Sequence, residues 1–252
     1  MQLEKYMNKV GRDQIKKYYS KKDVVVEYDK RRFSGVGGAY INDNEIEPHL
    51  NILSELFKKP SSISVLDIGA GRGRLSAPIK KEGFKVYPLD SSPEMVKFLK
   101  KHIQPKNIII QSAFDPIKSK TKFDVLTSLR FFDHFNISDQ KKLLKNFKNK
   151  LSSKGIVLFA TLNRLSLEFL VSSIFYYGKV NFYYSDQEYV TLFKSLGFEV
   201  VKREQRFFVP RGVILHTQKI PLLANLFIAI DRFLSALLPS GCAYFVYFLK
   251  RK

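Results

Sequence analysis

Two aspartates and a glycine-rich turn form the pattern with the clearest chemical meaning in this sequence. Asp67 ends a short apolar run, Gly69, Gly71 and Gly73 follow it, and Asp90 ends the next apolar run. Glycine lacks a Cβ, so the backbone can turn sharply and approach a ligand closely. A carboxylate at the end of the second run can accept hydrogen bonds from both hydroxyls of a ribose. The pattern therefore predicts a nucleotide cofactor, with a tight turn between strand and helix as the plain alternative.

His134 is the best candidate for a general base. It lies in LRFFDHF, directly after the fourth apolar run. Imidazole titrates near neutral pH, so this side chain could take a proton from a phenol, an alcohol or an amine. The alternative is a structural histidine that caps the following helix or packs beneath the site.

Strands that alternate with helices must position these residues. Ser92 before Pro93 and Ser138 before Asp139 are typical helix starts. The alternation predicts an α/β fold with a Rossmann-like, doubly wound and mostly parallel sheet, whose ligands bind at the carboxyl ends of the strands. Apolar runs predict strands at 63–68, 84–89, 107–110, 123–129 and 155–162, and helical patterns fall at 45–59, 75–83, 92–102 and 138–151.

The C-terminal part predicts an extra amphipathic helix at 220–239 before a last strand at 243–249. Asp231 and Arg232 make a membrane-spanning helix improbable. We expect its apolar arc to cover the sheet, with a membrane-facing role as the alternative. Two aromatic-rich segments, 172–185 and 206–216, are expected to cover the acceptor. The apolar arc consists of Leu222, Leu223, Leu226, Phe227, Ile230, Phe233, Leu234, Leu237 and Leu238.

Composition leaves the partner open. The 252 residues carry 43 lysines and arginines against 23 acidic residues, which gives a net charge of +20. Such a charge attracts nucleic acid, an anionic membrane surface or an acidic small molecule. The basic excess is spread along the chain, so it is not a detachable tail.

Nothing in the sequence divides the chain. It contains no proline-rich linker, low-complexity tract or internal repeat, so we expect one domain over 1–252. Within it we expect an N-terminal helical cap at 1–60, a cofactor-binding core at 61–162, and an acceptor-side lid with C-terminal strands at 163–252. Cys242 is the only cysteine and no apolar secretory segment begins the chain. We therefore expect a cytoplasmic location, with the inner face of the membrane as the peripheral alternative.

Four motifs occur in order between 61 and 162: VLDIGAGRGRLS, VYPLDSSPEMV, FDVLTSL and LSSKGIVLFATL. They resemble the successive motifs of class I S-adenosylmethionine-dependent methyltransferases, in particular small-molecule enzymes of the ubiquinone and menaquinone pathways. The turn reads GxGxG behind an acidic residue, whereas a nicotinamide-binding turn usually reads GxGxxG. Segments 28–50 and 184–201 are similar to the cap and the penultimate helix and strand of that family. The resemblance implies S-adenosylmethionine as cofactor and about seven strands, the last one antiparallel.

The resemblance also implies contacts with the amino-acid part of the cofactor. The glycine loop would bring its backbone against this part, Asp67 would orient the loop and the ammonium through water, and carbonyls at the end of the fourth strand would face the same group. Arg32 is a candidate for the cofactor carboxylate or is simply solvated. The residues expected here are Asp67, Gly69, Ala70, Gly71, Gly73, Ser128, Leu129 and Arg32.

A second set would hold the nucleoside. Asp90 would bind the ribose, and Ser91 and Met95 would flank the adenine. Ser112 stands where family members often have an acidic residue that meets the adenine amino group. Recognition there would rest instead on the backbone of Ala113 and on packing from Phe114.

The segment 130–134 departs from one subgroup. Ubiquinone-pathway O-methyltransferases show an ExxEH pattern that can bind a divalent metal, and this chain has Arg130 in place of the first carboxylate. A cation is a poor neighbour for a metal, so we expect no metal site. Arg130 could instead contact an anionic acceptor.

These observations favour a methyltransferase that acts on a small, apolar or aromatic acceptor, such as a quinone precursor or a lipid-like metabolite. An RNA methyltransferase is the alternative, because lysine rows on the helices at 92–102 and 138–151 could follow phosphates, although no RNA-binding module is recognisable. A third hypothesis is a cofactor-binding protein without catalysis. The sequence does not indicate an oligomeric state.

Overall fold

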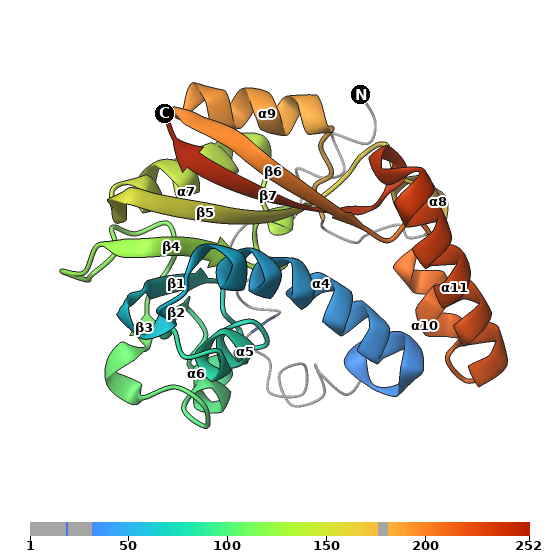
Figure 1. The fold of residues 1–252 in the computed structure, drawn as a ribbon, viewed down its shortest axis with the longest axis horizontal. Helices are drawn as coiled ribbons and strands as arrows, with labels where there is room; N and C mark the ends of the chain where they lie inside the picture. The colour runs from blue at the N-terminus through green and yellow to red at the C-terminus, as the bar shows by residue number, and fades with distance from the viewer. Residues whose placement is uncertain (1–18, 20–31, 176–180) are drawn as a thin grey trace.

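A computed structural model describes residue 19 and residues 32–175 and 181–252 of the chain. Within them a seven-stranded sheet has the order β3-β2-β1-β4-β5-β7-β6 (Figure 1). Strands β1 to β5 are parallel, whereas β7 runs antiparallel to both β5 and β6. This confirms the predicted α/β fold and its antiparallel last strand. The strands are β1 Ser64–Ile68, β2 Lys85–Asp90, β3 Ile109–Ile110, β4 Phe123–Ser128, β5 Leu151–Leu162, β6 Phe198–Arg206 and β7 Tyr244–Arg251.

Helices cover both faces of this sheet (Figure 1). Successive residues of a strand point to opposite faces, so Val65 packs in one apolar core with α4 and α5, and Leu66 packs in the other with α7 and α9. The helices are α4 Gly35–Leu56, α5 Ser76–Lys81, α6 Pro93–Leu99, α7 Ile137–Lys148, α8 Leu167–Phe175, α9 Asp186–Ser195, α10 Arg211–Thr217 and α11 Pro221–Leu237.

The strand order reverses between β1 and β4. From β1 the chain moves outward to β2 and β3, then returns to add β4 on the other side of β1. The loops after β1 and β4 therefore diverge, which opens a crevice at the carboxyl ends of these strands. This is where the sequence places its glycine turn.

Several predicted boundaries were wrong. Helix α4 begins at Gly35, ten residues before the predicted start, because Gly37 allows close packing on α10: a Cβ there would lie 2.6 Å from the Ile214 carbonyl oxygen. Helix α7 begins at Ile137 and is capped by Asn136, two residues before Ser138. The predicted strand at 107–110 shortens to β3, and β5 begins four residues early, at Leu151. The Ser92 cap is confirmed, since its side chain accepts from the Met95 amide.

The orientation of α11 also differs from the prediction. Its buried residues are Ala224, Ile228 and Asp231, so much of the predicted apolar arc faces outward. Asp231 fixes this orientation, because its carboxylate accepts hydrogen bonds at 2.7 Å from the Tyr40 hydroxyl and from the Val209 amide. The helix packs on α4 and α10 rather than covering the sheet with that arc.

Candidate active site

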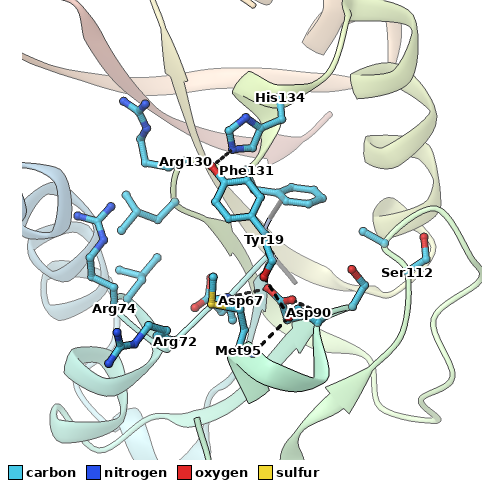
Figure 2. A pocket seen from close by; sticks show the side chains of 18 of the residues that line it. Tyr19, Asp67, Arg72, Arg74, Asp90, Met95, Ser112, Arg130, Phe131 and His134 are labelled. Carbon is cyan, nitrogen blue, oxygen red and sulfur yellow. Dashed lines mark hydrogen bonds between the residues drawn. The ribbon is translucent and has the colours of Figure 1, made fainter. Parts of the chain in front are cut away.

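A cavity of about 410 Å³ lies at the carboxyl ends of β1, β2 and β4 (Figure 2). Most of the predicted site residues meet in it, although they come from segments up to 67 positions apart. The predicted residues that line it are Asp67, Gly69, Ala70, Gly71, Asp90, Ser91, Met95, Ser112, Ala113, Phe114, Leu129, Arg130 and His134.

Three predicted residues lie elsewhere. Gly73 does not line the cavity, and a Cβ there would lie 2.8 Å from Cδ2 of Leu99, so this glycine makes room for helix α6. Ser128 is buried at the end of β4, and Arg32 is half-buried outside the lining. None of the described residues of 172–185 and 206–216 lines the cavity either.

The glycine loop is held against the end of β2. The amides of Gly69 and Ala70 donate to the Leu89 carbonyl at 2.9 and 3.0 Å. The Gly71 amide donates to Oδ2 of Asp90 at 2.8 Å, and the Ser92 amide donates to Oδ1 at the same distance. Burial raises the pKa of Asp90, and these backbone bonds oppose that rise. The carboxylate is thus fixed in place, with lone pairs left for further donors.

Two glycines of this loop have different surroundings. Both Gly69 and Gly71 have positive φ angles, of 68° and 56°. A Cβ on Gly69 would overlap the ring of Phe131, so that position serves the packing of an aromatic side chain. A Cβ on Gly71 would meet nothing within 4 Å. Gly71 is therefore the place where the loop presents bare backbone to open space.

Asp67 lies below the loop with an unsatisfied oxygen. Its Oδ2 accepts from the Ser76 hydroxyl at 2.5 Å, and its Oδ1 is buried without a hydrogen-bond partner. Burial raises the pKa of this carboxyl to about 7, although the Ser76 bond lowers it. A buried acceptor of this kind is satisfied by a donor from a ligand, and best by a cationic one.

Apolar side chains also line the cavity. They include Met95, Ala113 and Phe114, and the Phe114 ring packs edge-on against Phe135 at 5.1 Å between centroids. The Ser112 hydroxyl accepts from the Phe114 amide at 3.2 Å, so it supports its own loop. These surfaces suit a flat aromatic ring.

Tyr19 and His134 also line the cavity. The Tyr19 hydroxyl lies 3.1 Å from Nε2 of His134, and the two rings are 5.4 Å apart. Figure 2 shows the Tyr19 ring between His134 and the two aspartates of the cofactor motifs. A titratable pair thus faces the cavity beside the predicted cofactor position.

The comparisons with known proteins agree with this geometry. A model of the methyltransferase domain family matches residues 43–203, more than half of the chain. The chain belongs to the class I S-adenosylmethionine-dependent methyltransferase family. This confirms the predicted family and, with it, the predicted cofactor.

Relatives of this chain include ubiquinone biosynthesis O-methyltransferases. The Pelagibacter ubique protein is 30% identical over 135 residues, which are 52% of this chain and 55% of that protein. The Coxiella burnetii protein is 30% identical over 104 residues, 40% of this chain and 44% of that protein. The chain thus spans about half the length of the curated relatives it matches.

Solved structures share its fold. Magnesium protoporphyrin IX methyltransferase from Synechocystis PCC 6803, with bound SAH, has a TM-score of 0.67 at 14% identity and covers 96% of this chain and 100% of that one. The 1,6-didemethyltoxoflavin-N1-methyltransferase of Burkholderia thailandensis has a TM-score of 0.56 at 16% identity, with 91% and 86% covered.

The protein also carries a buried charge network beside the cavity. Glu45 receives Arg74 and Arg211, each at 2.6 Å, and Arg130 at 3.6 Å. Burial alone would raise the pKa of Glu45, but the three guanidinium groups lower it to about 2. Arg130 also pairs with Asp133, whose pKa burial raises to about 6. Arg130, which was predicted to contact the acceptor, is therefore paired with two carboxylates of the protein.

Sequence reasoning missed part of the lining. Asp115 lies three positions after Ser112, and a search for an acidic residue in that loop could have found it. Arg72 and Arg74 lie within the motif VLDIGAGRGRLS, where two cations next to glycines are themselves a signal. Tyr19 had no local signal. The missed lining residues are Tyr19, Arg72, Arg74, Leu75, Ser92, Asp115, Phe131 and Phe135.

The metal prediction stays a prediction. In the described ranges no group of three or more histidine, cysteine or acidic residues is arranged to hold a metal ion.

Proposed function

We propose that this chain transfers a methyl group from S-adenosylmethionine to a small, apolar or aromatic acceptor, such as a quinone precursor or a lipid-like metabolite. The unsatisfied Oδ1 of Asp67 at the end of β1 carries the proposal, because it suits the cofactor's ammonium. The open backbone at Gly71 and the fixed carboxylate of Asp90 suit the methionine and ribose parts. The residues present therefore fit the cofactor.

The nucleoside would lie against the apolar residues of the lining. Met95 and Phe114 would pack on the adenine, and Asp115, which also lines the cavity, would supply the acidic group for its amino group in place of Ser112. Leu129 would present its backbone carbonyl near the ammonium.

The bound cofactor supplies an already activated methyl group on a positively charged sulfur. The protein then has to place an acceptor in line with that methyl and exclude water. Leu129, Phe131 and Phe135 line the cavity beside His134 and give this region an aromatic and apolar surface. An apolar or aromatic acceptor fits this surface best.

Two further observations support this acceptor class. Glu45 and Asp133 pair with Arg130, so its guanidinium is a weaker candidate for an anionic acceptor than the sequence indicated. The curated relatives are named for ubiquinone biosynthesis, a name compatible with an acceptor that joins an aromatic ring to an apolar chain.

Titration calorimetry with S-adenosylhomocysteine tests the cofactor site. Asp90→Ala removes the carboxylate that would hold the ribose, and we expect at least about a tenfold weaker affinity. Asp43→Ala removes an exposed carboxylate outside the cavity and is the matched control. Equal affinity of wild type and Asp90→Ala would remove the ribose assignment.

We also propose that the protein associates peripherally with an anionic membrane, at the inner face of the cytoplasmic membrane. Its α11 stripe, defined as Leu222, Leu226, Ile230, Phe233 and Leu237, has a spacing of four, four, three and four and therefore occupies one helix face. The stripe lies opposite the buried face, and Leu222 and Phe233 are 83% and 67% exposed. Figure 1 places α11 at the periphery of the molecule.

Charge and length support this association. A net charge of +20 complements an anionic lipid surface, and an apolar stripe can lie in the interface without spanning the bilayer. Across the described ranges, every helix falls short of the length and apolarity that a membrane crossing requires.

Flotation with phosphatidylglycerol vesicles tests the association. We expect the wild type to float with the vesicles, and to do so less at high salt. The double variant Leu226→Ser/Phe233→Ser should remain in the bottom fraction. Val201→Ser changes an exposed apolar residue on β6 and is the control. Flotation of the double variant at the wild-type level would contradict the role of α11.

A further inference from the structure

Tyr19 lies in the cavity although it precedes the glycine loop by about fifty positions. Its carbonyl oxygen accepts from the Ser92 hydroxyl at 3.3 Å, and its own hydroxyl meets Nε2 of His134 at 3.1 Å. Ser92 caps α6 directly behind Asp90. Tyr19 is therefore fixed on one side to the motif that would hold the ribose and on the other to the candidate base (Figure 2).

His134 is held in a rigid turn. It ends the short 3₁₀ segment Phe132–His134, and its amide donates to the Phe131 carbonyl at 3.2 Å. The buried amide of Gln140 donates to the Phe132 and Phe135 carbonyls at 3.1 and 2.9 Å, on either side of His134. The imidazole thus has a fixed backbone from which Nε2 reaches the Tyr19 hydroxyl.

This contact changes what His134 can do. An imidazole nitrogen that is engaged by a phenol hydroxyl cannot also receive a proton directly from an acceptor. A tyrosine hydroxyl can accept one hydrogen bond and donate another at the same time. Tyr19 and His134 both line the cavity, so an acceptor that enters it can approach the Tyr19 hydroxyl.

We propose that Tyr19 and His134 form a proton relay for the acceptor, an inference that rests on the proposed methyl transfer. The acceptor O–H bond breaks and its proton goes to the Tyr19 oxygen, while the Tyr19 proton goes to Nε2 of His134. The acceptor oxygen forms the new bond to the methyl carbon, and the pair of electrons of the broken carbon–sulfur bond stays on sulfur, which becomes neutral. His134 then carries the released proton and loses it to water.

The relay assigns a function to the hydroxyl of Tyr19, which conservative substitutions can test. Tyr19→Phe keeps the ring and removes only the hydroxyl, and His134→Gln keeps a polar side chain and removes the base. Both residues act on the same proton. The double variant should therefore lose methyl-transfer rate by the same factor as the more affected single variant, and not by the product of the two single factors. Tyr87→Phe, whose ring packs on Phe123, and His102→Gln, at an exposed position, are the matched controls.

The experiment uses the full chain and two readouts. Nitrogen NMR of histidine-labelled protein saturated with S-adenosylhomocysteine reports the His134 Nε2 signal, assigned through His134→Gln. Transfer from methyl-labelled S-adenosylmethionine into an organic cell extract reports the rate. We expect Tyr19→Phe to shift the Nε2 signal and to lower transfer on the order of a hundredfold, with the affinity for S-adenosylhomocysteine changed less than about threefold.

The possible outcomes separate the two proposals. Wild-type transfer by Tyr19→Phe, multiplicative losses in the double variant, or an unmoved Nε2 signal would each overturn the relay and leave the methyltransferase intact. A wild-type protein that binds S-adenosylhomocysteine but labels nothing would remove the proposed function, and the relay with it.

Discussion

The Gly71 amide donates a hydrogen bond to Oδ2 of Asp90 at 2.8 Å and thereby joins the glycine loop to the end of the neighbouring strand. The Ser92 amide occupies the other oxygen. The hydrogen bonds to Asp90 therefore fix the position of the glycine loop and the orientation of the carboxylate at the same time. Such preorganisation lowers the cost of ordering the site when a ligand binds.

Asp67→Asn should raise thermal stability and weaken cofactor binding. Burial raises the pKa of Asp67 to about 7 from 3.8. Between about pH 3.8 and pH 7 the folded protein therefore holds a proton that the unfolded chain has lost. The free energy of unfolding falls as pH rises through this range. Thermal unfolding should show a gain for the variant that is larger at about pH 8 than at about pH 5. An equal gain at both values would contradict the raised pKa.

The same carboxyl predicts proton release on binding. An ammonium beside Oδ1 favours the ionised form, so cofactor binding near neutral pH should expel part of a proton. Calorimetric titrations with S-adenosylmethionine in buffers of different ionisation enthalpy measure this number directly. In Asp67→Asn the binding enthalpy should no longer depend on the buffer. If it still does, the released proton comes from a group other than Asp67.

Glu45→Gln should be among the most destabilising single changes near the site. It leaves the partly buried Arg74 and the buried Arg211 without their shared carboxylate, which costs about 3 to 5 kcal/mol. The pKa of Glu45 is lowered to about 2, so its contribution is present above about pH 4.5 and is lost as pH falls toward 2. Urea unfolding at neutral and acidic pH measures both effects.

The more exposed pair of Glu94 and Lys97 supplies the control for that measurement. Glu94→Gln should change the free energy of unfolding far less. A comparable loss in both variants would mean that the buried network adds little.

Alanine at two glycines of one loop should have opposite consequences. At Gly69 the new Cβ meets the Phe131 ring, and the positive φ adds strain, so we expect a loss of about 3 kcal/mol in stability. At Gly71 only the strain remains, about 1 kcal/mol, but the Cβ enters the open space where the cofactor would lie. Gly71→Ala should therefore fold and lose affinity for S-adenosylhomocysteine.

A second change tests the Gly69 explanation. Phe131→Ala should recover part of the stability lost in Gly69→Ala, because it removes the ring that the new Cβ meets. Strictly additive losses in urea unfolding would show that the two residues do not compete for space.

The sequence predicted the fold well because burial on both faces leaves continuous apolar runs, as in β1. The glycine motif and Asp90 were found because their spacing is local. Helix α4 was misplaced at its start because the glycines at 35–38 are atypical of helices, and only packing on α10 explains them.

The remaining differences come from contacts between distant segments. Tyr19 contacts His134 across 115 positions, and Glu45 pairs with arginines from three separate segments of the chain. Local patterns cannot show such pairs. Asp231, a carboxylate within the apolar helix at 221–237, was a readable sign that this helix is turned toward polar partners.

Methyl transfer to a small apolar acceptor is tested most directly by the destination of the methyl group. The purified protein is incubated with methyl-labelled S-adenosylmethionine and an extract of its own organism, which is then separated into lipid, polar-metabolite, RNA and protein fractions, with Asp90→Ala in parallel. We predict label in the organic fraction, and little with the variant. Label in RNA or in protein, or no label above that of the variant, would contradict the account.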